Sequence, residues 1–180
     1  FDFVTGHRHF DEKPVVLEKG QPIVVEGLHA LNDSLTYMLP RYEKVKISLG
    51  VLTQIRINDH NRISTSDTRI IRRMVRDQQF RDRGPMATMD IWADVRRGEE
   101  KNIYPYQEDA DTIFNTALPY ELSVLKPYAE PLLESIDKGS VHYAEARRLL
   151  RFLKPFKGID SSVVPPNSLL REFIGPDRKK

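Results

Sequence analysis

The chain has 180 residues and a net charge of only +2, although 30% of its residues are charged. With 39% hydrophobic residues it has the composition of a globular protein that buries one sizeable core. No run of ~18 apolar residues and no signal-peptide pattern occurs, so the sequence predicts no membrane span. Cys is absent, which excludes disulfides and thiolate metal sites and fits a reducing cytoplasm. We therefore expect a cytoplasmic protein.

The first ten residues combine aromatic and basic side chains. Phe1, Asp2 and His7 are candidates for the rim of a site that binds a planar, polar ligand. A loop that crosses the edge of a core has the same composition, and both interpretations stay open. No acidic residue stands at a ligand spacing from the histidines, so a metal site is not expected here. Because the chain starts without Met inside this pattern, we expect it to be part of a longer protein.

The clearest strand is predicted at residues 22–26, where three β-branched residues follow one another. Such an unbroken run is typical of a strand that is covered on both faces in a parallel sheet. The run ends at Glu26, and ligands of open α/β sheets bind at the carboxyl ends of strands. A carboxylate there can hold a magnesium ion directly or through water. The alternative is that Glu26 only caps the following turn.

Further elements are predicted along the rest of the chain. Residues 31–40 indicate a short helix. Alternation of apolar and polar residues predicts strands at 45–50 and 111–115. Helices are expected within the stretch 64–84, which ends in a turn, and at 86–98, 117–136, 140–156 and 169–174. The charged run at 96–101 is typical of a solvated helix end, and Trp92 is expected in the core. Two prolines, Pro127 and Pro131, predict a kink or break in their helix.

The stretch at residues 64–84, most of which is predicted to be helical, carries the most specific pattern of the chain. Its arginines fall at i, i+3, i+4 and i+7, which places one stripe of guanidiniums on a single face; they are Arg69, Arg72, Arg73 and Arg76. Ile70, Ile71, Met74 and Val75 fall on other faces and can dock on a core. Ser64 and Asp67 have the form of a capping box at the start of the helix. Arg81 and Arg83 follow it, just before a turn at Gly84.

These six guanidiniums stand within fifteen residues, 69–83, and repel one another. Either the stripe is solvated or an anion lies against it. Arg pairs bidentately with phosphate oxygens, and the stretch contains no Lys, which favours phosphate. One of Arg69 and Arg72 is expected to be structural, paired with a carboxylate such as Asp67 or Asp77.

The order of strand, Glu-Gly, strand, arginine helix, lid and strand resembles the uridine kinase branch of the phosphoribulokinase and uridine kinase family of P-loop kinases. The residues that carry the resemblance are F-D-F-V-T-G-H-R, P-I-V-V-E-G-L-H-A-L, T-R-I-I-R-R-M-V-R-D and A-D-T-I-F-N. Similarity to the longer bacterial members rests on R-R-G-E-E-K-N-I-Y-P-Y-Q, Y-E-L-S-V-L-K-P-Y-A-E-P-L-L and L-L-R-E-F-I-G. The resemblance thus covers nearly the whole chain.

The resemblance implies an α/β fold, namely part of a P-loop NTPase sheet of parallel strands with flanking helices. Residues 1–136 would belong to the kinase domain and residues 137–180 to a helical C-terminal extension. The implied activity is transfer of the γ-phosphate of ATP or GTP, with Mg²⁺, to a hydroxyl of a uridine-like nucleoside or related small molecule.

The resemblance also implies roles for particular residues. Arg76 and Arg81 match lid arginines that hold the transferring phosphates, and Glu26 matches an acid near the magnesium. Arg73 and Arg83 match arginines near the nucleoside, and Arg69 is a weaker match for nucleotide or substrate binding.

The sequence departs from the family in one decisive place. A P-loop kinase cradles phosphates with G-x-x-x-x-G-K-[ST], and no such stretch occurs here. In this fold a further strand, the one before that loop, lies between the strands expected at 22–26 and 45–50. We therefore expect the isolated chain to be inactive.

Two other interpretations stay open at this stage. One is a nucleic-acid-binding domain that uses the arginine stripe, although a net charge of +2 speaks against nucleic acid as the partner. The other is a regulatory pseudokinase module that keeps the fold without the chemistry. Self-association into a homo-oligomer is also left open.

Overall fold

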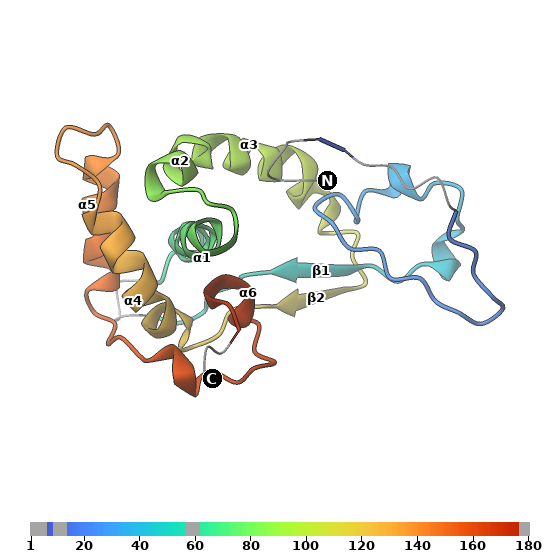
Figure 1. The fold of residues 1–180 in the computed structure, drawn as a ribbon. Helices are drawn as coiled ribbons and strands as arrows, with labels where there is room; N and C mark the ends of the chain where they lie inside the picture. The colour runs from blue at the N-terminus through green and yellow to red at the C-terminus, as the bar shows by residue number, and fades with distance from the viewer. Residues whose placement is uncertain (1–6, 9–13, 57–61, 177–180) are drawn as a thin grey trace.

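The computed structural model describes residues 7–8, 14–56 and 62–176. This part of the chain has an α/β arrangement, with helices packed around a central helix and a small parallel sheet beside them. Figure 1 looks along the central helix, α1 (Thr65–Phe80), and shows other helices on several sides of it. Residues 14–44 run at the end of the molecule away from residues 121–153 (Figure 1).

The sheet consists of β1 (Ile47–Gly50) and β2 (Thr112–Asn115), which run parallel with Leu49 opposite Phe114. Both strands and their direction confirm the predictions at 45–50 and 111–115. Parallel neighbours need a long crossover connection, and the chain between them holds α1 and the two helices after it. Side chains two apart on a strand share a face, so Ile47, Leu49 and Phe114 form one apolar face, and all three are exposed.

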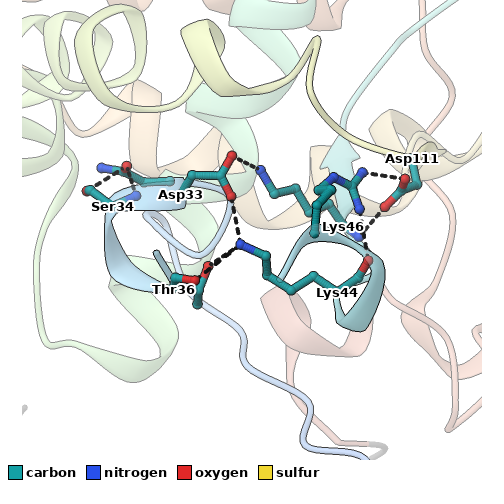
Figure 2. A network of polar contacts seen from close by, with 8 residues as sticks. Asp33, Ser34, Thr36, Lys44, Lys46 and Asp111 are labelled. Carbon is teal, nitrogen blue, oxygen red and sulfur yellow. Dashed lines mark hydrogen bonds and ion pairs between the residues drawn. The ribbon is translucent and has the colours of Figure 1, made fainter. Parts of the chain in front are cut away.

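A network of ion pairs ties β1 to the segments on either side of it (Figure 2). Asp33, in the short 3-10 turn η1 (Asp33–Leu35), accepts a hydrogen bond from Lys44 Nζ at 3.2 Å and pairs with Lys46 Nζ at 2.7 Å. The backbone N–H of Lys46 donates to Asp111 at 2.7 Å, just before β2. Hydrogen bonds from Lys46 and Lys44 hold the pKa of Asp33 below its usual range. The network therefore aligns the beginnings of the two strands.

Helix α1 begins at the predicted cap. Ser64 Oγ accepts a hydrogen bond from the Asp67 N–H at 3.2 Å, which is one half of a capping box. The Asp67 carboxylate does not return to the cap, because it binds the two terminal nitrogens of Arg148 at 2.8 and 2.6 Å. The apolar residues expected to dock on the core are all buried: Ile70, Ile71, Met74 and Val75.

The single helix predicted at residues 86–98 is two helices, α2 (Pro85–Asp90) and α3 (Trp92–Asn102), which meet at Ile91. The break has a packing reason: α2 lies against α1, whereas α3 continues toward the 3-10 turn η3. Trp92 packs against the core and is partly buried, close to what the sequence predicts. The other short 3-10 turns are η2 (Arg41–Glu43), η3 (Tyr104–Tyr106) and η4 (Ser161–Val163).

Three helices follow β2 and confirm the helices expected there; they are α4 (Glu121–Glu134), α5 (Tyr143–Leu153) and α6 (Arg171–Ile174). The break expected in the first of them is not formed, because α4 continues through Pro127 and Pro131. Each proline removes one backbone hydrogen bond, but burial of apolar side chains outweighs that loss. The buried side chains of α4 are Leu122, Val124, Leu125, Ala129 and Leu133.

The core joins the C-terminal helices to the rest of the described chain. Buried side chains of α1, α4, α5 and α6 form one continuous cluster. Leu149 and Leu153 come from α5, and Phe173 and Ile174 from α6. The division into residues 1–136 and 137–180 stays a prediction.

Two predicted elements before β1 are not formed. The strand expected at 22–26 is irregular, and Val24 is 89% exposed. A β-branched run becomes a strand only when a neighbour pairs with its backbone, and no segment of the described chain pairs with it. The helix expected at 31–40 is reduced to η1. Within the described residues, no helix is both long enough and apolar enough to cross a bilayer.

Candidate functional site

The arginine stripe of α1 is not a solvated surface, because its first two members are structural. Arg69 Nη1 donates to Glu99 of α3 at 2.7 Å and to the Tyr104 hydroxyl at 3.2 Å. Arg97, Glu100 and Lys101 are exposed at the end of α3, which confirms the solvated helix end predicted at 96–101, but Glu99 within it is buried. The ion pair draws this part of α3 onto α1.

Arg72 is the most deeply buried arginine of the stripe. Its Nε donates to Glu121 at the start of α4 at 2.7 Å, and Nη2 donates to the carbonyl of Thr116 at 2.7 Å. Its guanidinium also lies over the Phe173 ring of α6, 5.1 Å from the centroid. Burial raises the pKa of Glu121, and the charge of Arg72 opposes that rise. Arg72 thus joins three elements in the core.

The partners expected for these two arginines were wrong. Asp67 and Asp77 were the expected carboxylates, whereas Glu99 and Glu121 are the actual ones. The sequence predicts that one of these arginines is structural, and in the structure both are. The reason is geometric: Arg69 and Arg72 point toward helices that lie far along the sequence, and Asp67 and Asp77 are taken by other arginines.

The remaining arginines gather at the C-terminal end of α1. Arg73 is partly buried, and burial lowers its pKa. Asp77 opposes this shift, whereas the charges of Arg81, Arg76 and Arg83 add to it. Four guanidiniums therefore lie close enough to repel one another. We call them the arginine cluster: Arg73, Arg76, Arg81 and Arg83.

One buried carboxylate lies within the arginine cluster. Asp77 Oδ1 accepts a hydrogen bond from Arg81 Nη1 at 3.0 Å, and Oδ2 accepts one from the Thr88 hydroxyl of α2 at 3.2 Å. Arg73 Nε lies 3.3 Å from Oδ2 as an ion pair, without the geometry of a hydrogen bond. The side chain of Asp77 is 0% exposed.

Arg76 pairs with a different carboxylate, which is more exposed than Asp77. Its Nη1 donates to Glu172 of α6 at 2.8 Å, and half of the Glu172 side chain is exposed. The guanidinium lies over the Phe173 ring, 5.9 Å from the centroid. This pair connects the arginine cluster to the last helix.

Hydrogen-bonding capacity is left over in the arginine cluster. The buried Nε atoms of Arg73 and Arg76 have no hydrogen-bond partner among the described residues. Arg83 is held through its backbone, since its N–H donates to the Asp77 carbonyl at 3.2 Å. No hydrogen bond or ion pair within the described part of the chain involves its guanidinium. Buried donors without partners are rare and costly, so the cluster is suited to binding an anion.

The structure does not bring every predicted site residue to this cluster. Phe1 and Asp2 lie outside the described residues. His7 is exposed and Glu26 is exposed on an irregular segment. Among residues 7–8, 14–56 and 62–176, no group of three or more His, Asp or Glu side chains could hold a metal ion. The role of Glu26 near a magnesium ion stays a prediction.

The carboxylates that pair with the arginines were not expected from the sequence, although a signal exists for two of them. Glu121 stands next to the apolar run L-S-V-L, and Glu172 stands inside L-L-R-E-F-I. A charged residue within an apolar run is almost never buried without a partner. Such positions are therefore candidates for pairing with buried arginines.

The comparisons with known proteins add no relative to this picture. No family model matches the chain, and neither the curated proteins nor the solved structures contain a match.

Proposed function

We propose that the chain is part of a kinase that transfers the γ-phosphate of ATP or GTP to a hydroxyl of a uridine-like nucleoside or a related small molecule. The observation that carries the proposal is the arginine cluster at the end of α1. Arg73 and Arg81 share the buried carboxylate of Asp77, Arg76 pairs with Glu172, and the charges of all four arginines act on one another.

An anion with several acceptor oxygens would complete this cluster. Arg76 Nε makes no hydrogen bond within the described residues, and Arg73 Nε has only the ion-pair contact with Asp77 Oδ2 there. The guanidinium of Arg83 makes no ion pair within the same residues and could donate to an anion. A triphosphate carries oxygens on each phosphorus, so that one molecule can meet several guanidiniums at once. Arg is better suited than Lys to this role, because its planar fork matches the phosphate geometry.

The proposed roles follow from how charge develops during phosphoryl transfer. In the transition state, negative charge spreads over the equatorial oxygens of the transferring group. A guanidinium held at that place stabilises the transition state more than the ground state. We assign this role to Arg76 and Arg81, and we assign contacts near the nucleoside to Arg73 and Arg83. Arg69 was also a candidate, but its pairing with Glu99 favours a structural role.

The fold is compatible with this proposal. Parallel strands with helical crossovers are the architecture of nucleotide-binding α/β proteins. The sequence contains no phosphate-cradling glycine loop, so the proposal requires that loop to come from another segment. It also assigns no step to a magnesium ion held by Glu26, since the described residues around Glu26 supply no further ligands.

Binding of inorganic tripolyphosphate to the 180-residue chain tests the proposal. Calorimetry should detect one site per chain, and Arg76→Ala should weaken it by roughly tenfold or more, because a charged hydrogen-bond donor is lost. Arg97→Ala is the matched control, because within the described residues Arg97 pairs only with the exposed Asp94, and its loss changes the net charge equally. Equal weakening by both variants, or no binding by the wild type, would contradict the proposal.

Salt dependence and turnover separate this proposal from its alternatives. Binding to a nucleic acid falls steeply with salt and requires a polymer, whereas tripolyphosphate binds without one. A chain that prefers a single-stranded oligonucleotide to tripolyphosphate at every salt concentration is a nucleic-acid-binding domain. The isolated chain should show no phosphoryl transfer with ATP, Mg²⁺ and a panel of nucleosides, and turnover would refute the need for a loop from elsewhere.

A further inference from the structure

The arginine cluster contains a feature that its charge alone does not explain. A carboxylate inside an anion-binding site weakens the binding of any anion, because like charges repel. Asp77 nevertheless lies in the middle of the cluster, with its side chain completely buried. A buried carboxylate in this place needs a compensating reason.

We propose that Asp77 is a positioning residue, which holds the guanidiniums of Arg73 and Arg81 and the turn of Arg83 in the geometry that binds a phosphate chain. This inference rests on the proposed function, because it concerns how the same phosphate site is built. Asp77 itself does not touch the phosphates.

Asp77 reaches two arginines through its carboxylate. Oδ1 accepts a hydrogen bond from Arg81 Nη1 at 3.0 Å, and Oδ2 lies 3.3 Å from Arg73 Nε. Both contacts span four residues, one back along α1 and one forward into the turn after it. The carboxylate thus sets how far apart these two guanidiniums stand. Without it, their mutual repulsion would separate them into solvent.

The backbone carbonyl of Asp77 positions the third arginine. It accepts hydrogen bonds from the N–H groups of Arg81 at 3.0 Å and Arg83 at 3.2 Å. Between them Asp82 adopts a left-handed conformation, with φ of 48°. The same residue therefore fixes both the end of α1 and the turn that carries Arg83.

The carboxylate of Asp77 is oriented from outside α1. Thr88 of α2 donates its hydroxyl proton to Oδ2 at 3.2 Å, and Thr88 is completely buried. A fixed carboxylate is needed if the arginines are to be fixed in turn. Thr88 thus acts on the arginine cluster through Asp77.

Asp77→Asn tests the inference, with Asp82→Asn as the matched control. Both substitutions remove one negative charge, at residues next to cluster members in the sequence or in contact with them, and Asn tolerates the left-handed conformation at residue 82. If charge alone mattered, both variants would bind tripolyphosphate more tightly than the wild type. Positioning predicts that Asp77→Asn binds about tenfold more weakly, although its net charge is more positive, because the fixed arginine geometry is lost. Asp82→Asn should bind equally well or more tightly.

The affinity must be measured on folded protein, with circular dichroism as the check. A purely structural role for Asp77 would lower the midpoint of thermal unfolding but leave the affinity of the folded protein unchanged or tighter, and this result would overturn the inference. If Asp77→Asn does not fold, Thr88→Val decides, because it keeps the net charge and removes only the hydrogen bond to Oδ2. Thr88→Val should bind about threefold more weakly, and an affinity equal to the wild type would overturn the inference.

The outcomes also separate this inference from the proposed function. If the wild type binds no tripolyphosphate, both fail together. If the wild type binds and Arg76→Ala weakens binding, but Asp77→Asn behaves like Asp82→Asn, the phosphate site stands and only the positioning role of Asp77 is refuted.

Discussion

The pair of Arg72 and Glu121 lies in the interior, with side-chain exposures of 7% and 3%. Removing one member leaves the other charge buried without a partner. We expect Arg72→Ala to lower the free energy of unfolding by ~3–5 kcal/mol in urea titrations. Replacing both, as Arg72→Met with Glu121→Leu, should recover much of the loss, because no buried charge remains.

The control for this prediction is an ion pair on the surface. Arg97 and Asp94 in α3 are both mostly exposed. Arg97→Ala should change the free energy of unfolding by under ~0.5 kcal/mol. If Arg72→Ala and Arg97→Ala lowered the free energy of unfolding by similar amounts, burial of the ion pair would not determine the cost of breaking it.

Arg83 differs from Arg69 in what it contacts, and the difference predicts opposite effects. Arg83→Ala should leave the urea midpoint unchanged, because its guanidinium makes no ion pair within the described chain, and should weaken tripolyphosphate binding by roughly tenfold. Arg69→Ala should lower stability, since it removes a partner of the buried Glu99, and should leave the affinity unchanged. If Arg69→Ala weakened binding and Arg83→Ala did not, the anion site would lie near Arg69 and not at the arginine cluster.

Single residues show where sequence reasoning about the site succeeds and where it ends. Helical spacing predicts that Arg69, Arg72, Arg73 and Arg76 share one stripe, because the helical period is a local property. Their partners are set by packing between distant segments. Spacing therefore could not predict that Arg69 and Arg72 have structural roles while Arg73 and Arg76 belong to the arginine cluster.

Helix α6 contributes Glu172, a carboxylate that competes with any anion for Arg76. We expect Glu172→Gln to tighten tripolyphosphate binding by about twofold to fivefold, a modest effect because the pair is partly solvated. Glu134→Gln in α4 makes the same change of charge at an exposed position and serves as the control. Isothermal titration calorimetry of both variants checks this prediction, which fails if the two variants bind equally tightly.

Helix α5 is held to the first turn of α1 through Arg148, and Arg148 also pairs within α5 with Glu145, whose pKa it lowers. Glu145 accepts hydrogen bonds from Arg148 at 2.8 and 2.7 Å, and these lower the pKa of Glu145. A lowered folded-state pKa contributes stability above the pKa of a free Glu, about 4.3, and that stability is lost as the pH falls through the folded-state value. The wild type should therefore lose stability between about pH 7 and about pH 3.

Glu145→Gln isolates this contribution. The variant should show a smaller difference between its urea midpoints at the two pH values, because Gln does not titrate. Arg148 keeps its contact with Asp67 in the variant, so the helix should stay docked. An undiminished loss of stability on acidification would assign the effect to other carboxylates.

At the scale of elements, local pattern was sufficient for α1, β1 and β2 and insufficient for two others. The arginine helix has a cap, an apolar side and a turn at its end, so that several local signals agree. The run at 22–26 has a high β-propensity, but no other local signal supports a strand there. A strand forms only when a neighbouring strand pairs with it. The break at Ile91 follows from how α2 and α3 pack. No Gly or Pro stands at this position, so the sequence does not signal the break.

For the molecule as a whole, the open face of the sheet predicts self-association. Ile47, Leu49 and Phe114 expose 52%, 67% and 60% of their surface on one side of β1 and β2. Apolar side chains that gather on a surface drive association. We expect Leu49→Lys to lower the sedimentation coefficient or light scattering at high concentration while keeping the urea midpoint, because the site is already solvated. Unchanged association would exclude this face as the contact.

The α/β class of the whole molecule could be predicted, because strand and helix patterns alternate along the chain. The size of the sheet could not. Pairing of β1 with β2 depends on which strands find neighbours, and a third strand expected at 22–26 stays irregular and exposed in the described chain.

The pairing of α1 also constrains the order in which the chain can fold during its synthesis. The partners of its arginines and of Asp67 come 30, 49, 81 and 96 residues away along the chain. Contacts of such long sequence separation form late, because closing long loops costs entropy before any contact is gained. Arg73 can pair with Asp77 as soon as α1 forms, whereas Arg69, Arg72 and Arg76 wait for Glu99, Glu121 and Glu172 in turn. The stripe is therefore neutralised step by step during synthesis, and its pair with α6 forms after those with α3 and α4.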